Sequence, residues 1–393
     1  MGVISDFSES KFGRRRPFIF WGTMVCALGM ALLGYSVMLG NLMGDKPNGG
    51  EVSDHIRGLV LAISGLWVMN VCVNVVQGPA RAIVADLVPQ EEQQTGNAMV
   101  SNVQGISAVL ANVVGAQLFY TDNPYVWLFS IGVVVILLSI IPTLLVAKEN
   151  KFERPPGTPK PTILSVFAKI FRGFYQMPNA MVRTVLLYFF SWSAFAPFMI
   201  YLTQYFAREV YPNDYEYGVK MGMYALAGYA GVSLLYALLL PSVLRLVGVK
   251  VAYFLSQLLA TACYLLFLFF PQPPTAFLLT ALLGINFTTF NSIPFALVTS
   301  IVDPKDAGLF MGVLNSASVV SQTLSNTLAG QIVAWKGESV GWGIAFGSLF
   351  SFIALILVFF LPTQHSSPSP PKSLNNETDS LLNTSSHRIN SDN

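Results

Sequence analysis

The chain has 393 residues, of which 53% are hydrophobic and 11% are charged, whereas about 25% of the residues in a typical soluble domain are charged. The formal net charge is +2, and so small an excess gives no indication of a nucleic-acid partner. This composition excludes an ordinary soluble domain and predicts an integral membrane protein. The sequence contains no ordered Ser/His/Asp set, no phosphate-binding glycine loop and no metal-ligand spacing, so we expect no enzyme activity, no metal and no cofactor.

Apolar segments long enough to cross a bilayer, about 20 residues each, recur along the chain. Turn sequences such as NGG at 48–50 and PQPP at 271–274 separate them, and short connections of this kind predict antiparallel neighbouring helices. The sequence therefore predicts an all-α polytopic transmembrane helix bundle of about ten spans. They are expected at 17–39, 57–80, 97–118, 126–147, 184–206, 218–241, 251–270, 275–299, 308–333 and 342–362.

A basic, proline-rich stretch at 148–183 divides the chain. We expect a partial first half of four spans within 1–147 and a second half of six spans within 184–362. The stretch between them would be a cytoplasmic loop with a short amphipathic helix at the membrane surface. Residues 363–393 are polar and rich in Pro, Ser and Asn, which predicts a disordered tail. Most lysines and arginines lie in segments on the same side as the N-terminus, so both termini are expected to be cytoplasmic.

The chain opens with GVISDFSESKFGRRRPFI, in which an aspartate precedes a glycine and three arginines. A carboxylate at a helix end can bind arginines and backbone N–H groups of neighbouring helices. Asp6 with Gly13, Arg14 and Arg15 would then form a latch that opens during a conformational change. The alternative is a plain charge cluster that holds the first span on the cytoplasmic side.

The second span carries a stripe of polar residues. Asn70, Asn74, Gln77 and Arg81 follow one another at helical spacing and therefore share one face. Ionisable residues at membrane depth usually face a bundle interior or a wet cavity, which makes Arg81 a candidate contact for a polar substrate. The alternative for the amides is hydrogen bonding between helices.

Other spans contain polar or aromatic residues that are candidates for the same role. For the polar stripes of the third and ninth spans the alternative is helix packing, and for the aromatic residue it is anchoring at the membrane interface. These residues are Asn97, Ser101 and Gln104 in the third span, Trp192 in the fifth, Asn286 and Asn291 in the eighth, and Asn315, Ser318, Gln322 and Asn326 in the ninth.

Several stretches, in the same order, resemble one known family. The opening stretch is similar to the loop between the second and third helices of major facilitator superfamily transporters, and especially of the sucrose transporter group. That group includes plant sucrose:proton symporters and animal proton-associated sugar transporters. QGPARAIVADL at 77–87, FSWSAFAPFMIYLTQYFAREVY at 190–211, NSIPFAL at 291–297 and GVLNSASVVSQ at 312–322 resemble its fourth, seventh, tenth and eleventh helices. PSVLRLVGVK at 241–250 resembles a second copy of the opening motif without its aspartate.

The resemblance implies a twelve-helix fold in which the ten spans are helices three to twelve. Helices one and two would then be absent, either through an incomplete gene model or transcript or because the protein is a ten-helix transporter. The resemblance also implies a sugar transporter that works by alternating access. Its substrate would be sucrose or another disaccharide or glycoside, and protons would be the co-transported ion.

On the same basis, the expected sugar contacts are Arg81, Gln77, Asn74, Asn70, Trp192 and Gln204, and the expected coupling or gating residues include Asp86, Arg208 and Glu209. The sequence departs from the family at Asn70, Leu202 and Gln204, where sucrose:proton symporters carry aspartates. An amide cannot take up a proton in the working pH range. Uncoupled sugar facilitation and a non-transporting membrane sensor, scaffold or inactive fragment are therefore the alternatives.

The tail contains ETDSLL at 377–382, which fits an acidic dileucine sorting signal of Glu377, Leu381 and Leu382. Sorting adaptors read such signals from cytoplasmic tails. We therefore expect the protein in the plasma membrane or in an endosomal or vacuolar membrane, with the lipid bilayer, a sugar and protons as its other partners.

Overall fold

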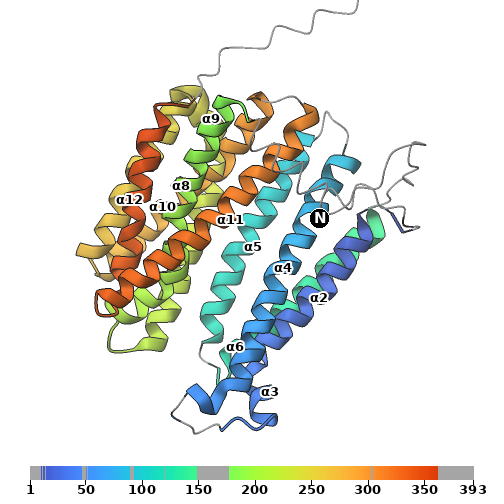
Figure 1. Ribbon diagram of the computed structural model, residues 1–393, viewed down its shortest axis with the longest axis vertical. Helices are drawn as coiled ribbons and strands as arrows, with labels where there is room; N and C mark the ends of the chain where they lie inside the picture. The colour runs from blue at the N-terminus through green and yellow to red at the C-terminus, as the bar shows by residue number, and fades with distance from the viewer. Residues whose placement is uncertain are drawn as a thin grey trace, which may run out of the picture.

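The computed structural model describes residues 10, 12–13, 15–46, 50, 52–88, 93–119, 121–147, 177–301 and 304–361. Within these residues all regular secondary structure is helical, which confirms the predicted all-α class (Figure 1). The helices are α2 (Arg16–Gly34), α3 (Ser36–Leu42), η1 (Val52–His55), α4 (Ile56–Leu87), α5 (Gln93–Leu118), α6 (Pro124–Val146), α8 (Asn179–Tyr205), η2 (Phe206–Val210), α9 (Tyr215–Phe269), α10 (Pro273–Ile301), α11 (Pro304–Trp335) and α12 (Val340–Val358).

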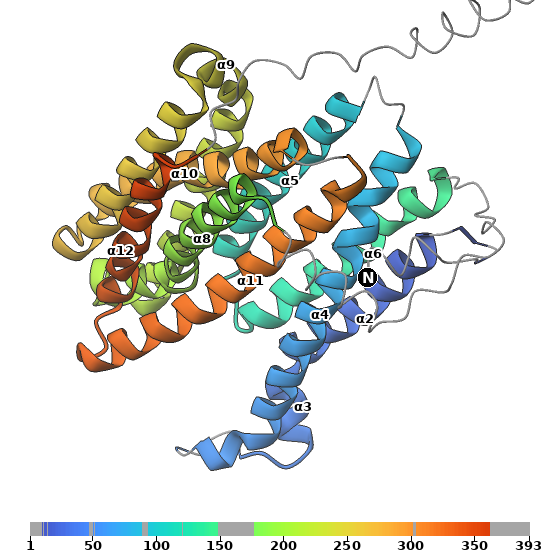
Figure 2. The same cartoon turned by 45° about the horizontal axis from the view of Figure 1, so that its top comes forward.

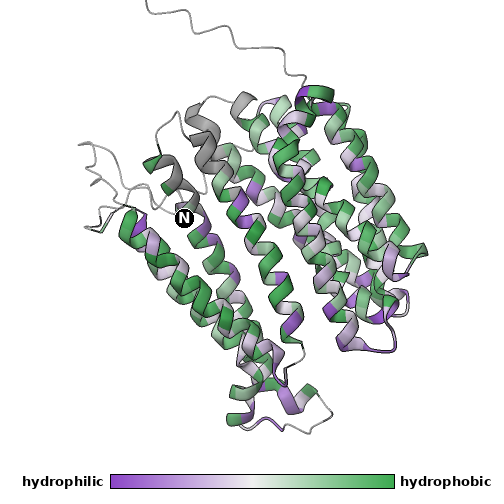
Figure 3. Cartoon of the chain, turned by 180° about the vertical axis from the view of Figure 1, so that it is seen from behind, coloured by the Kyte–Doolittle hydropathy of each residue, from purple (hydrophilic) through white to green (hydrophobic). Residues whose placement is uncertain are grey.

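All ten predicted spans fall on these helices. Among the described residues, seven helices are long and apolar enough to cross a membrane. Helix α9 contains two of the predicted spans, while the polar stripes of α5 and α11 lower their hydropathy and leave them out of the seven. Figure 3 shows hydrophobic residues over most of the helix lengths, with hydrophilic residues more frequent at the helix ends. The protein is therefore a multi-pass integral membrane protein.

The largest boundary differences concern α4 and α9. Helix α4 continues to Leu87 rather than ending at residue 80, and it includes Pro79. Within α9 the helical assignment runs over the predicted loop at 241–250, but non-helical backbone at Gly248 divides α9 into two helices, so the predicted break between the two spans is present. That stretch reads PSVLRLVGVK, and its leucines and valines do not favour a turn. Only its glycine interrupts the helix.

Helix α9 consists of two segments that meet at Gly248. The backbone angles there, φ 80° and ψ 162°, are non-helical, and glycine tolerates them because it lacks a Cβ atom. Gly13, which precedes α2, also has a positive φ, 106°. The two glycines belong to the opening motif and to its predicted second copy, and both have a positive φ.

Two groups of helices lie side by side (Figure 1 and Figure 2). In one group α2 packs against α4 and α6, and in the other α8 and α9 pack against each other and against both α10 and α12. Helix α5 comes from the first part of the chain but packs chiefly against α9, and α11 packs chiefly against α8. The second group encloses the larger buried core. The first contains a small cluster of Ile19, Ile83, Ile140 and Ala147.

A buried hydrogen-bond network joins four helices of the second group. Gln257 on α9 is fully buried. Its Oε1 accepts hydrogen bonds from Ser351 Oγ on α12 at 2.9 Å and from Asn286 Nδ2 on α10 at 3.1 Å, and its Nε2 donates to Ser191 Oγ on α8. Unpaired polar groups at such a place cost about 1–3 kcal/mol each. We therefore expect α8, α9, α10 and α12 to keep one mutual arrangement and to move as a unit.

Candidate functional site

A cavity of about 510 Å³ lies between α5, α8, α9, α10 and α11. This volume is within the range of about 300–1,000 Å³ that is common for small-molecule sites. None of the described lining residues carries a formal charge. They are Gln104, Gly105, Ala108, Trp192, Phe195, Ala196, Met199, Ile200, Tyr229, Ala230, Ser233, Leu234, Ala237, Phe287, Thr288, Asn291, Ser292, Gln322 and Asn326.

One wall of the cavity is aromatic. Phe195 on α8 stacks on Tyr229 of α9 and on Phe287 of α10, with ring centroids 5.9 and 5.0 Å apart. Trp192 makes an edge contact with Phe195 at 5.6 Å. Three helices therefore hold these four rings in fixed positions. Such a wall suits a ligand with an apolar face.

Three residues that line the cavity have buried polar atoms that lack a hydrogen-bond partner among the described residues. Tyr229 is 7% exposed, yet its hydroxyl has no hydrogen-bond partner among the described residues, and the same is true of Trp192 Nε1 and Asn326 Oδ1. Buried polar groups are nearly always hydrogen-bonded. Two donors and one acceptor on three different helices are therefore buried without a partner beside the cavity.

Glycines allow the cavity helices to approach closely. A Cβ atom on Gly284 of α10 would lie 2.5 Å from the carbonyl oxygen of Tyr229, and one on Gly105 of α5 would lie 2.8 Å from Leu234 Cδ1. Ser233 on α9 and Thr288 on α10 hydrogen-bond across the same contact, with their hydroxyl oxygens 2.8 Å apart. The glycine at 284 therefore helps to fix the position of Tyr229.

The amides predicted on α4 lie outside the lining of this cavity. Asn70 and Asn74 are exposed, and their Nδ2 groups donate to the carbonyls of Leu66 and Asn70 on their own helix, both at 2.8 Å. Gln77 is half-buried. Arg81 and Asp86 belong to α4, but their side chains lie outside the described part of the structure, so their predicted roles stay predictions.

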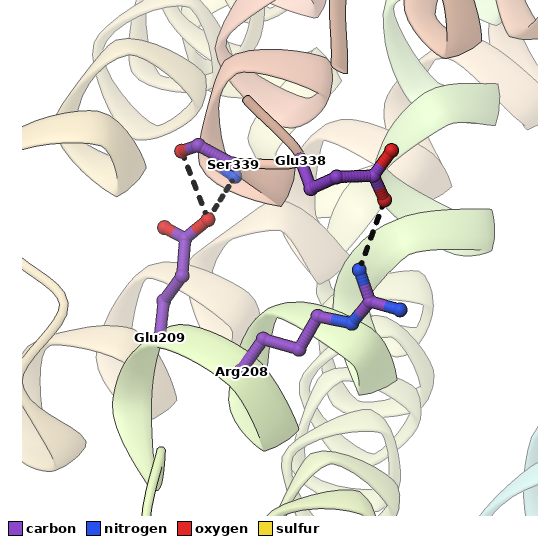
Figure 4. Close-up of polar contacts among 5 residues, drawn as sticks. Arg208, Glu209, Glu338 and Ser339 are labelled. Carbon is purple, nitrogen blue, oxygen red and sulfur yellow. Dashed lines mark hydrogen bonds and ion pairs between the residues drawn. The ribbon is translucent and has the colours of Figure 1, made fainter. Parts of the chain in front are cut away.

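The predicted residues of α8 and η2 are divided between two places. Trp192 lines the cavity, whereas Gln204, which is half-buried, does not. Arg208 and Glu209 lie beyond it, on the π-helical turn η2. Figure 4 shows both side chains directed toward the turn between α11 and α12.

The remaining predicted features lie near the two ends of the chain and in its central segment. Gly13 is buried, its N–H donates to the carbonyl oxygen of Ser10 at 3.2 Å, and Arg15 is 6% exposed. The predicted latch residues Asp6 and Arg14, the central segment with its predicted surface helix, and the sorting motif of Glu377, Leu381 and Leu382 lie outside the described residues.

The family model of the Major Facilitator Superfamily matches residues 1–240 and 184–390 of this chain. The two matches together cover most of the chain. The chain belongs to the Major Facilitator Superfamily. It is similar to the sucrose transport protein SUT1 of Oryza sativa subsp. japonica, with 26% identity over 424 residues that cover 92% of this chain and 78% of that protein. It is also 26% identical to the sucrose transport protein SUC4 of Arabidopsis thaliana, over 94% and 81% of the two chains.

Solved structures of the superfamily share the fold. The fucose:proton symporter FucP of Escherichia coli aligns with a TM-score of 0.59 at 15% identity, over 92% of this chain and 86% of that one. A POT family transporter in complex with a conjugated peptide aligns with a TM-score of 0.61 at 13% identity, over 91% and 87% of the chains. The expected resemblance to the superfamily and its sucrose transporter group is confirmed, and these relatives are transporters rather than enzymes.

Sequence reasoning missed three of the four aromatic residues of the cavity. Phe195, Tyr229 and Phe287 lie in apolar spans, where aromatic residues at helical spacing are typical of ordinary packing. One available signal is the interval from Trp192 to Phe195, which places both rings on one face of α8. Tyr229 and Ser233, four residues apart, likewise lie on one face of α9.

Proposed function

We propose that this member of the superfamily transports a sugar across the membrane, with sucrose or another disaccharide or glycoside as its substrate. The observation that carries the proposal is the cavity between α5 and α8–α11, in which Tyr229, Trp192 and Asn326 have polar atoms without partners among the described residues. The similarity to sucrose transport proteins along most of the chain supports the same substrate class.

The proposed mode of recognition combines ring stacking with hydrogen bonds. A sugar ring presents C–H groups on its faces and hydroxyls on its rim. The C–H groups would contact Trp192 and Phe195, and the hydroxyls would bind Tyr229 and the amides of Gln322 and Asn326. A largely apolar wall with few polar groups is the usual composition of small-molecule sites. An uncharged lining favours an uncharged ligand.

Transport would proceed by alternating access, in which two halves rock around a central site. The first half would comprise the spans within 1–147 and the second those within 184–362, with both termini in the cytoplasm. Proton symport is the proposed coupling, with Asp86 as the candidate carrier. Arg81, next to the same end of α4, is the proposed sugar contact on the first half.

Uncoupled facilitation is the second candidate. Leu202, which is fully buried, and Gln204 stand where sucrose:proton symporters carry aspartates, and no carboxylate lines the described cavity. Addition of sucrose to a weakly buffered suspension of proteoliposomes distinguishes the two. Symport raises the external pH as sugar enters, whereas facilitation leaves it unchanged.

Uptake of radiolabelled sucrose and maltose into proteoliposomes tests the proposal itself. The variant Trp192→Leu should reduce uptake at least tenfold, because it removes a ring face and an indole N–H from the cavity. Trp335→Leu is the matched control, since Trp335 is 79% exposed at the end of α11 and does not line the cavity. Absence of uptake of either sugar by correctly inserted protein refutes sugar transport by this chain.

A further inference from the structure

The end of helix α8 makes two polar contacts with the turn between α11 and α12. The π-helical turn η2 (Phe206–Val210) carries Arg208 and Glu209 in succession. Arg208 Nη1 pairs with Glu338 Oε2 at 3.3 Å, and Glu209 contacts the first residues of α12 (Figure 4). π-Helical turns interrupt regular helices and frequently occur at functional sites. Here the interruption coincides with two charged contacts to another helix.

Glu209 caps the N-terminus of α12. Its Oε1 accepts hydrogen bonds from the Gly341 N–H at 2.8 Å and from Ser339 Oγ at 3.1 Å. The first N–H groups of a helix have no partner within the helix, and a carboxylate there also interacts favourably with the helix dipole. Ser339, the N-cap residue, makes no side-chain capping bond of its own to α12. A carboxylate from another helix therefore satisfies the Gly341 N–H.

The observed position of Glu209 depends on glycine at position 341. A Cβ atom on Gly341 would lie 2.7 Å from Glu209 Oε2, so the carboxylate would have to shift away from α12. The preceding turn is also constrained, because Gly337 and Glu338 both have positive φ angles, 68° and 69°. The turn therefore presents Glu338 to Arg208 and Gly341 to Glu209 at the same time.

We propose that Glu209 is a positioning residue that joins α8 to α12, and that it is not the proton carrier of the transport cycle. The proposal rests on the proposed function and concerns its coupling. Seventeen residues separate Trp192 from Glu209, about 25 Å along a helix at 1.5 Å per residue. Glu209 does not line the cavity, and its Oε1 is already occupied by two donors.

This contact has a mechanical consequence for the cavity. Helix α8 provides Trp192 and Phe195, and its far end is fixed to α12. The Gln257 network fixes its middle through Ser191. We therefore expect the end of α8 to stay with α12 when the cavity opens, with the opening movement made by other helices.

Neutral variants of Glu209 distinguish the two roles. In Glu209→Gln the amide oxygen can still accept both hydrogen bonds, so we expect proton-driven sucrose uptake to keep at least half its rate and its pH profile. The charged and titratable groups near Glu209 are Arg208, Glu338 and Tyr205, and the variant leaves all three unchanged. The Tyr205 hydroxyl donates to the Phe267 carbonyl oxygen at 2.7 Å. Loss of proton-driven accumulation with sugar exchange retained would identify Glu209 as a proton carrier and overturn the proposal.

A second experiment needs no transport. In Glu209→Ala, deuterium exchange at the amides of residues 340–343 should accelerate at least tenfold, and the melting temperature should fall more than in Glu209→Gln. Gly341→Ala should lower the melting temperature of the wild-type protein but not of Glu209→Ala, where the space of the carboxylate is free. Gly228→Ala is the matched control, because a Cβ atom there meets nothing within 4 Å.

Equal effects of Gly341→Ala in the two backgrounds would overturn the capping contact. If wild-type protein takes up no sugar, the proposed function fails, but exchange and melting still decide whether Glu209 positions α12.

Discussion

Removal of the Tyr229 hydroxyl should weaken sugar binding without destabilising the protein. The variant Tyr229→Phe keeps the ring contacts with Phe195 and Phe287, whose centroids lie 5.9 and 5.8 Å away. The hydroxyl has no partner among the described residues, so its loss breaks no internal hydrogen bond. A buried, unpaired hydroxyl costs about 1–3 kcal/mol, and the variant should therefore be as stable as the wild type or more stable.

The expected loss in affinity follows from one hydrogen bond. A neutral hydrogen bond contributes about 0.5–1.5 kcal/mol, which corresponds to an approximately 2- to 13-fold increase in the Kd for sugar. Titration calorimetry with sucrose measures the Kd, and a thermal melt measures stability.

Tyr264→Phe is the matched control for this prediction. Tyr264 is fully buried in the core of the second helix group, its hydroxyl also has no partner among the described residues, and it does not line the cavity. It should share the stability effect and leave the Kd unchanged. Equal Kd values for the Tyr229 variant and the wild type, or an equal loss in both variants, would refute the assignment of Tyr229 to the site.

Three further variants test the packing around the site. Gln257→Leu removes the Oε1 acceptor of Asn286 and Ser351, while the carbonyls of Ser256 and Gln257 remain as acceptors for them at 3.1 and 3.3 Å. The variant should therefore destabilise the protein by about 1–3 kcal/mol, and an unchanged melting temperature would contradict the network. Gly284→Ala should lower the free energy of unfolding by about 1–3 kcal/mol through overpacking and should also weaken sugar binding. Calorimetry measures the affinity, with Gly228→Ala as the control. Normal affinity would show that Tyr229 is positioned independently of α10. Arg208→Ala should lower the free energy of unfolding by less than about 1 kcal/mol, because the side chains of Arg208 and Glu338 are 45% and 72% exposed and exposed ion pairs contribute little to stability. Thermal melts at low and high salt measure this loss. A larger loss that does not depend on salt would be inconsistent with an exposed ion pair.

The sequence predicted the fold well because each span is a long apolar segment. The break predicted between residues 241 and 251 is present at Gly248. The main boundary error concerns α4, which continues past Pro79 to Leu87. A membrane-spanning helix satisfies its own backbone hydrogen bonds and can therefore continue past residues that would end a helix in water.

The candidate site was predicted less completely. Helical spacing identifies residues that share a face, but it does not say what that face meets. The stripe of Gln322 and Asn326 faces the cavity, whereas Asn70 and Asn74 are exposed and bond within α4. The aromatic wall could not be told from core packing, because its residues come from three helices whose mutual contacts are long-range.

Helix α5 links parts of the chain that are distant in sequence. Its Gln117 Nε2 donates to Tyr224 OH on α9, and its Gly105 and Gly115 lie against Leu234 and Met223 of the same helix. A cut anywhere between residues 147 and 177 would separate the chain into two polypeptides that still share this helix pair. We expect such fragments to stay associated when they are produced together, because side-chain contact rather than chain continuity holds the two parts of the transporter in register.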